Sequence, residues 1–240
     1  RPERAEVAAV EALLALAARH GVPLHVVHVS TVGAAELIRD ARARQDVTCE
    51  TCPQYLWLDE TWLDRPDGHR WLCSPPLRGD RERFRALARE GAFDLFATDH
   101  CAFRKPDKDD WDGRDVRTVA NGLPGLGGLL HHAWKLFADD ADRAAAEVSV
   151  RLAKNPAALL GLEGRKGALR SGLDADVVVL DPNGPERPVR ATESDAYDPF
   201  PGFTPKLALR HVLVHGEPVV RDGDLVDPAV RRGQLHPNHD

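Results

Sequence analysis

The sequence predicts an α/β protein in which a parallel sheet is followed by a small β domain. Over residues 1–162, segments with helical spacing of apolar residues alternate with apolar extended segments. Parallel strands need a connection of helical length between them, so this alternation indicates a parallel sheet. After Leu162 the pattern changes, because Gly164, Gly167 and Gly172 separate short segments that lead into an apolar extended stretch at residues 175–180. We therefore expect two units, residues 1–162 and residues 163–240.

The elements of the first unit follow from their patterns in chain order. Apolar residues recur at helical spacing over residues 4–19, and Gly21 and Pro23 stop that helix. Further helices are predicted over residues 32–44, 80–89, 127–137, 143–154 and 155–160, and strands over residues 24–29, 47–50 and 93–98. The apolar stretch 53–58 is predicted to be extended, which argues against a thioredoxin-like role for the preceding Cys49-x-x-Cys52 pair.

The second unit begins with a strong strand over residues 175–180, which is almost entirely apolar and rich in valine. Residues 209–215 and 217–221 predict a hairpin that turns at Gly216. Within the first unit, residues 101–124 form a long segment rich in Asp, Gly and Pro. A loop of that length is more often functional than accidental. Its acidic part, residues 107–115, lacks the ligand spacing of a calcium loop and is predicted to be a solvated lid or a crossing loop.

Composition excludes several classes of function. Hydrophobic residues make up 42% of the chain and charged residues 29%, with a formal net charge of -6 and scattered basic residues. These values fit a globular protein and give no sign of a nucleic-acid or membrane partner. Four cysteines without a second metal-binding pair are predicted to be free thiols in or near the core, in a reducing, cytoplasmic setting. The absence of methionine favours a piece of a longer reading frame.

Eight short motifs occur in an order that is specific when taken together. Polar residues lie at or just beyond the ends of predicted strands, as His28 and Asp99 do, which is where enzymes with alternating strands and helices place their chemistry. The motifs are His28-Val29-Ser30, Glu50-Thr51-Cys52-Pro53-Gln54-Tyr55-Leu56, Ser74-Pro75-Pro76-Leu77-Arg78, Thr98-Asp99-His100-Cys101, Asn121-Gly122-Leu123-Pro124-Gly125, Asn155-Pro156-Ala157, Gly167-x-Leu169-x-x-Gly172-x-Asp174-Ala175-Asp176 and Tyr197-x-Pro199-Phe200-x-Gly202. They resemble the second half of the amidohydrolase superfamily in its hydantoinase/dihydropyrimidinase branch.

The resemblance implies the C-terminal part of a TIM-like (β/α)8 metal-dependent hydrolase barrel, followed by a small β-sandwich domain. Such a barrel holds two divalent metals, usually zinc, with an H-x-H pair, a carboxylated lysine, two further histidines and an aspartate. His28 matches the last histidine and Asp99 the aspartate, whereas the other ligands are expected before Arg1. His25 is not expected to replace one, because on a strand it and His28 point to opposite faces.

The chemistry implied by the resemblance is hydrolysis of a cyclic amide C–N bond in a hydantoin, dihydropyrimidine or related ring. The metals bring a bound water towards hydroxide near neutral pH. Asp99 is the candidate catalytic residue, which takes the proton of the water and delivers it to the leaving nitrogen. Ser74 and Asn121 match the residues whose backbone groups hydrogen-bond the ring. A buried ring amide needs such partners, because polar groups are costly when they are buried and left unpaired. His100 and Cys101 adjoin this site without an assigned role.

Alternatives remain within and outside this class. An allantoinase or a dihydroorotase-like enzyme would use similar residues, and Leu126-Gly127-Gly128-Leu129 departs from the branch pattern of an acidic and a basic residue after Pro-Gly. A non-catalytic homologue or remnant that acts by protein association is a different class. The isolated chain is expected to be inactive, because two ligands cannot hold a bridged metal pair. The parent protein is expected to be a homo-oligomer, a tetramer by resemblance.

Overall fold

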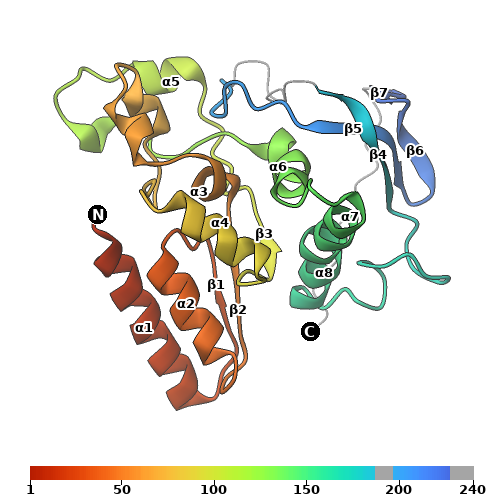
Figure 1. The fold of residues 1–240 in the computed structure, drawn as a ribbon, viewed down its shortest axis with the longest axis horizontal. Helices are drawn as coiled ribbons and strands as arrows, with labels where there is room; N and C mark the ends of the chain where they lie inside the picture. The colour runs from red at the N-terminus through yellow and green to blue at the C-terminus, as the bar shows by residue number, and fades with distance from the viewer. Residues whose placement is uncertain (187–196, 228–240) are drawn as a thin grey trace.

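A computed structural model of the chain describes residues 1–186 and 197–227, in which a parallel sheet and an antiparallel sheet are linked by helices (Figure 1). The parallel sheet has the order β1-β2-β3. Its strands are β1 (Leu24–Val26), β2 (Val47–Thr51) and β3 (Leu95–Phe96). Two of these strands end earlier than predicted. Val27, predicted to continue β1, and Ala97, predicted to continue β3, are outside the strands because the chain turns into a left-handed conformation just beyond them, at His28 and Asp99.

The helices of the parallel half are α1 (Glu3–His20), α2 (Val32–Ala41), α3 (Pro53–Trp57) and α4 (Arg81–Arg89), with the short 3-10 helices η1 (Glu60–Asp64) and η2 (Gly68–Trp71). Of these, α1, α2 and α4 were predicted, whereas α3 and the two short 3-10 helices were not. Local signals set their ends: Gly21, at φ 63°, ends α1, and the side chains of Thr31 and Asp80 accept backbone N–H groups at the starts of α2 and α4. In Figure 1, α2 lies between α1 and the strands β1 and β2.

Helix α3 corrects the prediction that residues 53–58 are extended. Cys52 is in an extended conformation and Pro53 occupies the first turn, where a missing N–H and a fixed φ favour a helix start. A short apolar run does not reveal its period, so the sequence pattern could not separate helix from strand. The prediction of free thiols is confirmed: all four cysteines are free, and Cys49 and Cys52 are completely buried.

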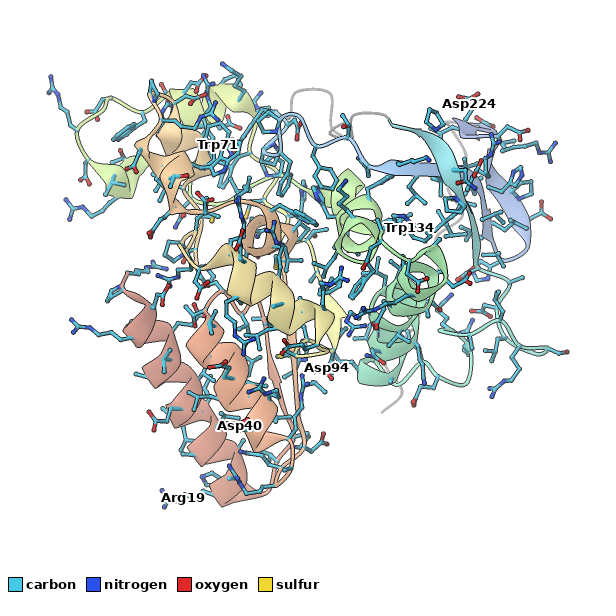
Figure 2. The ribbon with its side chains drawn as sticks, viewed as in Figure 1. Arg19, Asp40, Trp71, Asp94, Trp134 and Asp224 are labelled. Carbon is cyan, nitrogen blue, oxygen red and sulfur yellow. The ribbon has the colours of Figure 1, made fainter. Side chains whose placement is uncertain are left out.

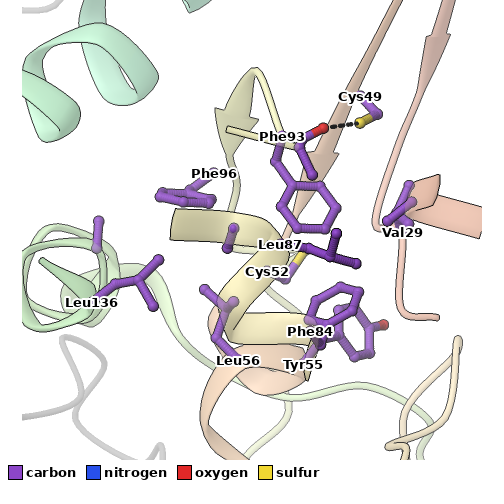
Figure 3. Close-up of a cluster of buried hydrophobic side chains, with 14 of the residues drawn as sticks. Val29, Cys49, Cys52, Tyr55, Leu56, Phe84, Leu87, Phe93, Phe96 and Leu136 are labelled. Atoms are coloured by element: carbon purple, nitrogen blue, oxygen red, sulfur yellow. Dashed lines mark hydrogen bonds between the residues drawn. The ribbon is translucent and has the colours of Figure 1, made fainter. Parts of the chain in front are cut away.

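The core of this half lies between the sheet and the helices that pack against it. Figure 3 shows Phe84 and Leu87 of α4 packed beside Phe93 and Cys52. The Cys49 thiol donates a hydrogen bond to the Ala92 carbonyl, drawn as a dashed line in Figure 3. The Phe84 and Phe93 rings are 5.1 Å apart, a separation typical of tilted aromatic pairs. This packing anchors the sheet from one side and leaves the carboxyl ends of the strands to the loops.

The middle of the chain is more structured than a plain loop. It contains α5 (Lys105–Asp109), η3 (Val116–Thr118) and η4 (Leu126–Gly128), then α6 (Leu129–Leu136), α7 (Ala141–Ser149), the π-helical η5 (Val150–Lys154) and α8 (Asn155–Leu159). Helix α5 falls in the stretch that was predicted to be a solvated lid. None of the helices among the described residues is both long enough and apolar enough to cross a membrane.

The second half forms one antiparallel sheet with the order β4-β5-β6-β7. Its strands are β4 (Val177–Glu186), β5 (Lys206–Val214), β6 (Glu217–Arg221) and β7 (Asp224–Leu225). The predicted hairpin at Gly216 is confirmed, since β5 pairs with β6 across that turn. The division at Leu162 and the β-sandwich remain predictions, and residues 187–196 and 228–240 of the predicted second unit lie outside the described residues.

Candidate active site

His28 and Asp99 lie at the same edge of the parallel sheet, just beyond the carboxyl ends of β1 and β3. Both adopt positive φ, 41° for His28 and 47° for Asp99, and they are two of the four non-glycine residues that do so in the described part of the chain. The left-handed conformation costs a residue with a Cβ roughly 1–2 kcal/mol. The other two, His215 and Asp222, lie beside glycines in the turns of the antiparallel sheet. Strain of this kind concentrates at functional sites, so it supports a role for His28 and Asp99.

Backbone hydrogen bonds to β2 fix the segments that carry these two residues. The Val29 N–H donates to the Glu50 carbonyl at 2.9 Å, and the Thr51 hydroxyl donates to the Val29 carbonyl at 2.8 Å. On the other side of β2, the Ala97 N–H donates to the Thr51 carbonyl at 3.0 Å. The central strand β2 therefore fixes the residues that directly follow β1 and β3.

The electrostatic environment links the two predicted ligands. Burial raises the pKa of the Asp99 carboxyl above its ordinary value, while the nearby His28 lowers it and Glu50 raises it. The structure therefore brings Asp99 and His28 within electrostatic range, as the sequence predicts. A histidine nitrogen and a carboxylate oxygen are both suitable ligands for a divalent metal such as zinc.

His25 is held away from this pair by its neighbours on the sheet. Its Nδ1 lies 2.8 Å from the Thr48 hydroxyl, and its Nε2 lies 3.3 Å from a Glu50 carboxylate oxygen. The Nδ1 atom is thus hydrogen-bonded to β2, and Nε2 faces the Glu50 carboxylate on the same strand without a hydrogen bond. This arrangement agrees with the expectation that His25 does not replace a missing ligand.

The ligand set formed by these residues is partial. Within residues 1–186 and 197–227, no group of three or more His, Cys, Asp or Glu side chains is arranged to hold a metal ion. His28 and Asp99 have the right donor chemistry, but a closed metal site needs about four ligands. The structure therefore fits a metal centre to which this chain contributes two donors.

Ser74 and Asn121 are carried by two loops that are tied to each other and to the Asp99 segment. The Gly122 N–H donates to the Leu72 carbonyl at 3.0 Å, which joins the loop of Asn121 to the loop of Ser74. The Cys101 N–H donates to the Leu123 carbonyl at 2.9 Å. The described part of the chain offers no hydrogen-bond partner to the backbone of Ser74 or of Asn121. Both backbones can therefore accept a ligand, although the Ser74 hydroxyl contacts Arg1.

Gly122 is required by this close approach. Its φ is 149°, and a Cβ at this position would overlap the side chain of Cys101. The His100 ring completes the junction, because its Nδ1 accepts the Gly125 N–H at 3.1 Å. His100, which had no assigned role, therefore braces the Asn121 loop.

Glu6 was not predicted and is the residue that holds the His28 segment from outside. Its carboxylate accepts the Ser30 N–H at 2.7 Å and the Thr31 N–H at 3.1 Å, and it contacts the Ser30 hydroxyl. Arg78, which follows the Ser74 loop, lies 3.4 Å from the same carboxylate. The sequence signal was its position: Glu6 is four residues before Val10, in line with the buried stripe of α1.

Replacing Glu6 with glutamine is expected to destabilise the protein. Glu6→Gln replaces one carboxylate oxygen, which accepts hydrogen bonds, with an amide NH2 group, which only donates them. Some of the Ser30 and Thr31 groups that donate to Glu6 therefore lose their acceptor. The free energy of unfolding should fall by about 2–3 kcal/mol. Denaturant unfolding measures this loss, and Glu11→Gln, at an exposed site on α1, is the matched control. Equal stability of the two variants would contradict the role of Glu6.

Lys108 is the second residue that the sequence pattern missed. It lies on α5, in the stretch predicted to be a solvated lid, yet its exposed fraction is 0%. Its Nζ donates to the Leu72 carbonyl at 2.8 Å. Burial lowers the pKa of the ammonium from 10.5 to about 8, while Cys73 and Cys101 oppose the shift. No sequence signal marks this lysine, because only the tertiary fold covers it.

The lowered pKa predicts a stability that rises in alkali. Between pH 8 and 10.5 the unfolded chain still binds the Lys108 proton that the folded chain has lost. Relative to Lys108→Met, the free energy of unfolding of the wild type should therefore increase across this window, by on the order of 3 kcal/mol in total. Denaturant unfolding of both proteins at about pH 7 and about pH 10 tests this. A stability difference that does not change with pH would show that Lys108 titrates normally.

Comparisons with known proteins agree with this geometry. The model of a family described as the amidohydrolase family matches residues 3–220. D-phenylhydantoinase of Escherichia coli O81 (strain ED1a) is 37% identical over 96% of this chain and 51% of that protein. A D-hydantoinase crystal structure superposes with a TM-score of 0.84 at 32% identity, covering 94% of this chain and 51% of that one. The crystal structure of dihydropyrimidinase from Brevibacillus agri NCHU1002 superposes with a TM-score of 0.84 at 31% identity, covering 94% of this chain and 50% of that one. The chain thus spans about half the length of these relatives.

Proposed function

Because the chain belongs to the amidohydrolase family, we propose that it forms the C-terminal half of a metal-dependent enzyme that hydrolyses a cyclic amide. The observation that carries this proposal is the meeting of His28 and Asp99 at one edge of the sheet, both in a strained backbone conformation. Relatives that superpose on 94% of this chain are titled D-hydantoinase and dihydropyrimidinase. The proposed substrate is accordingly a hydantoin or a dihydropyrimidine.

The proposed architecture is a (β/α)8 barrel followed by a β-sandwich domain, of which this chain supplies the last strands of the barrel. Three features support it. The parallel strands follow one another in chain order, helices lie on one side of them, and the polar pair His25 and Glu50 lies on the sheet between β1 and β2. A barrel of this type places its active site at the carboxyl ends of its strands, which is the edge where His28 and Asp99 lie.

His28 and Asp99 would hold part of a divalent metal pair, proposed to be zinc. The remaining ligands, including a carboxylated lysine, would come from outside this chain. When bound, the metals supply the Lewis acidity that activates a water for attack on the ring carbonyl. Two residues of this chain would act on that centre. His28 and Asp99 would position the metals, and the Asp99 carboxylate would take the proton of the water.

The same carboxylate completes the reaction. The ring opens only if the leaving nitrogen gains a proton, and Asp99 would deliver to it the proton taken from the water. Burial raises the pKa of Asp99 above its ordinary value, which makes its carboxylate a better proton acceptor than that of an exposed aspartate. The backbone groups of Ser74 and Asn121, which have no partner within the described residues, would hydrogen-bond the amide of the ring.

Two alternatives remain as outcomes of the test. An allantoinase or a dihydroorotase-like enzyme would need the same metal donors and differ in the ring, and a non-catalytic homologue would act by association alone. The proposed enzyme works in the cytoplasm, since all four thiols are free, and as a homo-tetramer. Neither a nucleic acid nor a membrane is a proposed partner.

The test uses the chain completed by the N-terminal half of Escherichia coli D-phenylhydantoinase, fused or supplied separately. Hydrolysis of hydantoin, dihydrouracil, allantoin and dihydroorotate is followed by loss of ring absorbance, with metal content measured in parallel. Turnover of hydantoin or dihydrouracil supports the proposal. Turnover confined to allantoin or dihydroorotate selects the alternative enzymes. Metal binding without any turnover selects the non-catalytic homologue.

A further inference from the structure

One carbonyl oxygen joins the two loops that carry the proposed ring-binding residues. The Leu72 carbonyl accepts the Gly122 N–H at 3.0 Å and the Lys108 ammonium at 2.8 Å. Leu72 lies two residues before Ser74, and Gly122 directly follows Asn121. The position of this single oxygen therefore sets the spacing between the two loops. In Figure 2, Trp71, the neighbour of Leu72, lies next to α5, at the end of the parallel half opposite Arg19.

The surroundings of Lys108 are unusual for a lysine. Its side chain is completely buried, and no carboxylate among the described residues forms an ion pair with it. The thiols of Cys73 and Cys101 are the ionisable groups that act on the pKa of its ammonium, and the Phe103 ring centroid lies 5.8 Å from Nζ. A buried ammonium without a carboxylate costs stability, and an apolar side chain of similar length would cost less. Stability alone does not account for a lysine here.

The layer around Lys108 is also tightly packed towards the Asn121 loop. A Cβ at Gly122 would lie 3.4 Å from the Phe103 ring as well as overlapping Cys101. On the outer side, Asp109 holds α5 against η2 through Arg70, with Nε to Oδ1 at 2.6 Å. The Lys108 side chain therefore lies between α5, which Asp109 ties to η2, and the Asn121 loop. Its ammonium has little freedom to move away from the Leu72 carbonyl.

We propose that Lys108 is a positioning residue for recognition of the ring, because its ammonium holds the Leu72 carbonyl and so fixes Ser74 relative to Asn121. The link to the ring rests on the proposed function, whereas the link to loop geometry does not. Lys108 donates a charge-assisted hydrogen bond, which is stronger than a neutral one and restricts the direction of the carbonyl. Loss of this bond should leave the chain folded and the two loops less ordered.

Hydrogen exchange in the 240-residue chain tests the positioning role directly. In Lys108→Met the Gly122 amide, which shares the Leu72 carbonyl, should exchange roughly tenfold faster, the equivalent of about one hydrogen bond. The Val212 amide in β5 is the internal reference and should not change. The denaturation midpoint should stay the same or rise. Lys105→Met, which removes an exposed ammonium from the same helix, is the matched control and should leave Gly122 exchange unchanged.

The kinetic arm separates this inference from the proposed function. In the completed enzyme, Lys108→Met should raise KM for the hydrolysed ring by roughly tenfold with little change in kcat and in metal content. Parallel acceleration at Gly122 and Val212 would mean a merely structural lysine, and unchanged exchange at Gly122 would also overturn the proposal. If the wild type hydrolyses no ring, the proposed function fails, while the exchange result still decides whether Lys108 positions the loops.

Discussion

The 240-residue chain by itself is expected to hydrolyse neither hydantoin nor dihydrouracil and to bind at most one divalent metal weakly. Among its described residues His28 and Asp99 lie within electrostatic range of each other, and no group of three or more possible ligands forms. A four-ligand zinc site gains roughly 10–16 kcal/mol from its metal. Two donors supply about half of that, which corresponds to a dissociation constant of roughly 1 μM or weaker.

Zinc titration and metal analysis after dialysis measure this directly, with hydrolysis assayed in parallel. A chain carrying His28→Ala together with Asp99→Asn is the matched control and should lose the residual binding. Adding the N-terminal half of D-phenylhydantoinase should raise both metal content and turnover. Robust turnover by the isolated chain would refute the argument that its metal centre is incomplete.

Asp99→Asn is expected to reduce kcat of the completed enzyme by at least about 10³-fold. The amide cannot take a proton from the water and return it to the leaving nitrogen, and general acid–base catalysis alone contributes roughly 10²–10⁴-fold. The same change also weakens a metal ligand. The near-isosteric replacement should leave the fold intact, although the left-handed conformation of residue 99 must persist, which asparagine tolerates well.

His28→Gln separates the two roles of Asp99. This variant removes a metal ligand without removing the proton carrier, so excess zinc should restore part of its kcat. Asp99→Asn should stay inactive at the same zinc concentration. Asp40→Asn, at an exposed position on α2, controls for loss of a carboxylate as such. Equal recovery of the His28 and Asp99 variants with zinc would show that Asp99 is only a ligand.

The candidate site illustrates what a residue pattern reveals. His28 and Asp99 follow apolar strands directly, and motif order places Ser74 and Asn121 in loops at the same edge, so these positions were open to prediction from the sequence. The strand lengths were not. Val27 and Ala97 have the residue types of a strand, but the turns needed at His28 and Asp99 end β1 and β3 early. The strand propensity of Val27 and Ala97 gives no information about the backbone turn that follows each of them at the site.

The supporting residues depend on contacts between distant segments. Glu6 reaches Ser30 from α1, and Lys108 reaches Leu72 across 36 positions of the chain. An isolated stretch of sequence gives Glu6 the character of a surface glutamate and places Lys108 in a charged loop. Burial is a property of the assembled fold, so the role of Lys108 could not be read from its neighbours in sequence. The place of Glu6 in line with the buried stripe of α1 was a signal, but it did not identify Ser30 and Thr31 as partners. The prediction for residues 53–58 was wrong for a related reason, because four consecutive residues, Pro53 to Leu56, are buried and leave no periodic face in the sequence.

The sequence by itself determined the alternation of helices and strands, the hairpin at Gly216, the free thiols and the identity of the candidate donors His28 and Asp99. These depend on spacing, turn chemistry and composition, which are local properties. Only the tertiary structure decided that Glu6 holds the His28 segment and that Lys108 is buried against Leu72. The physical reason is that a charged side chain acquires its partners, its desolvation and its pKa from segments that folding brings to it.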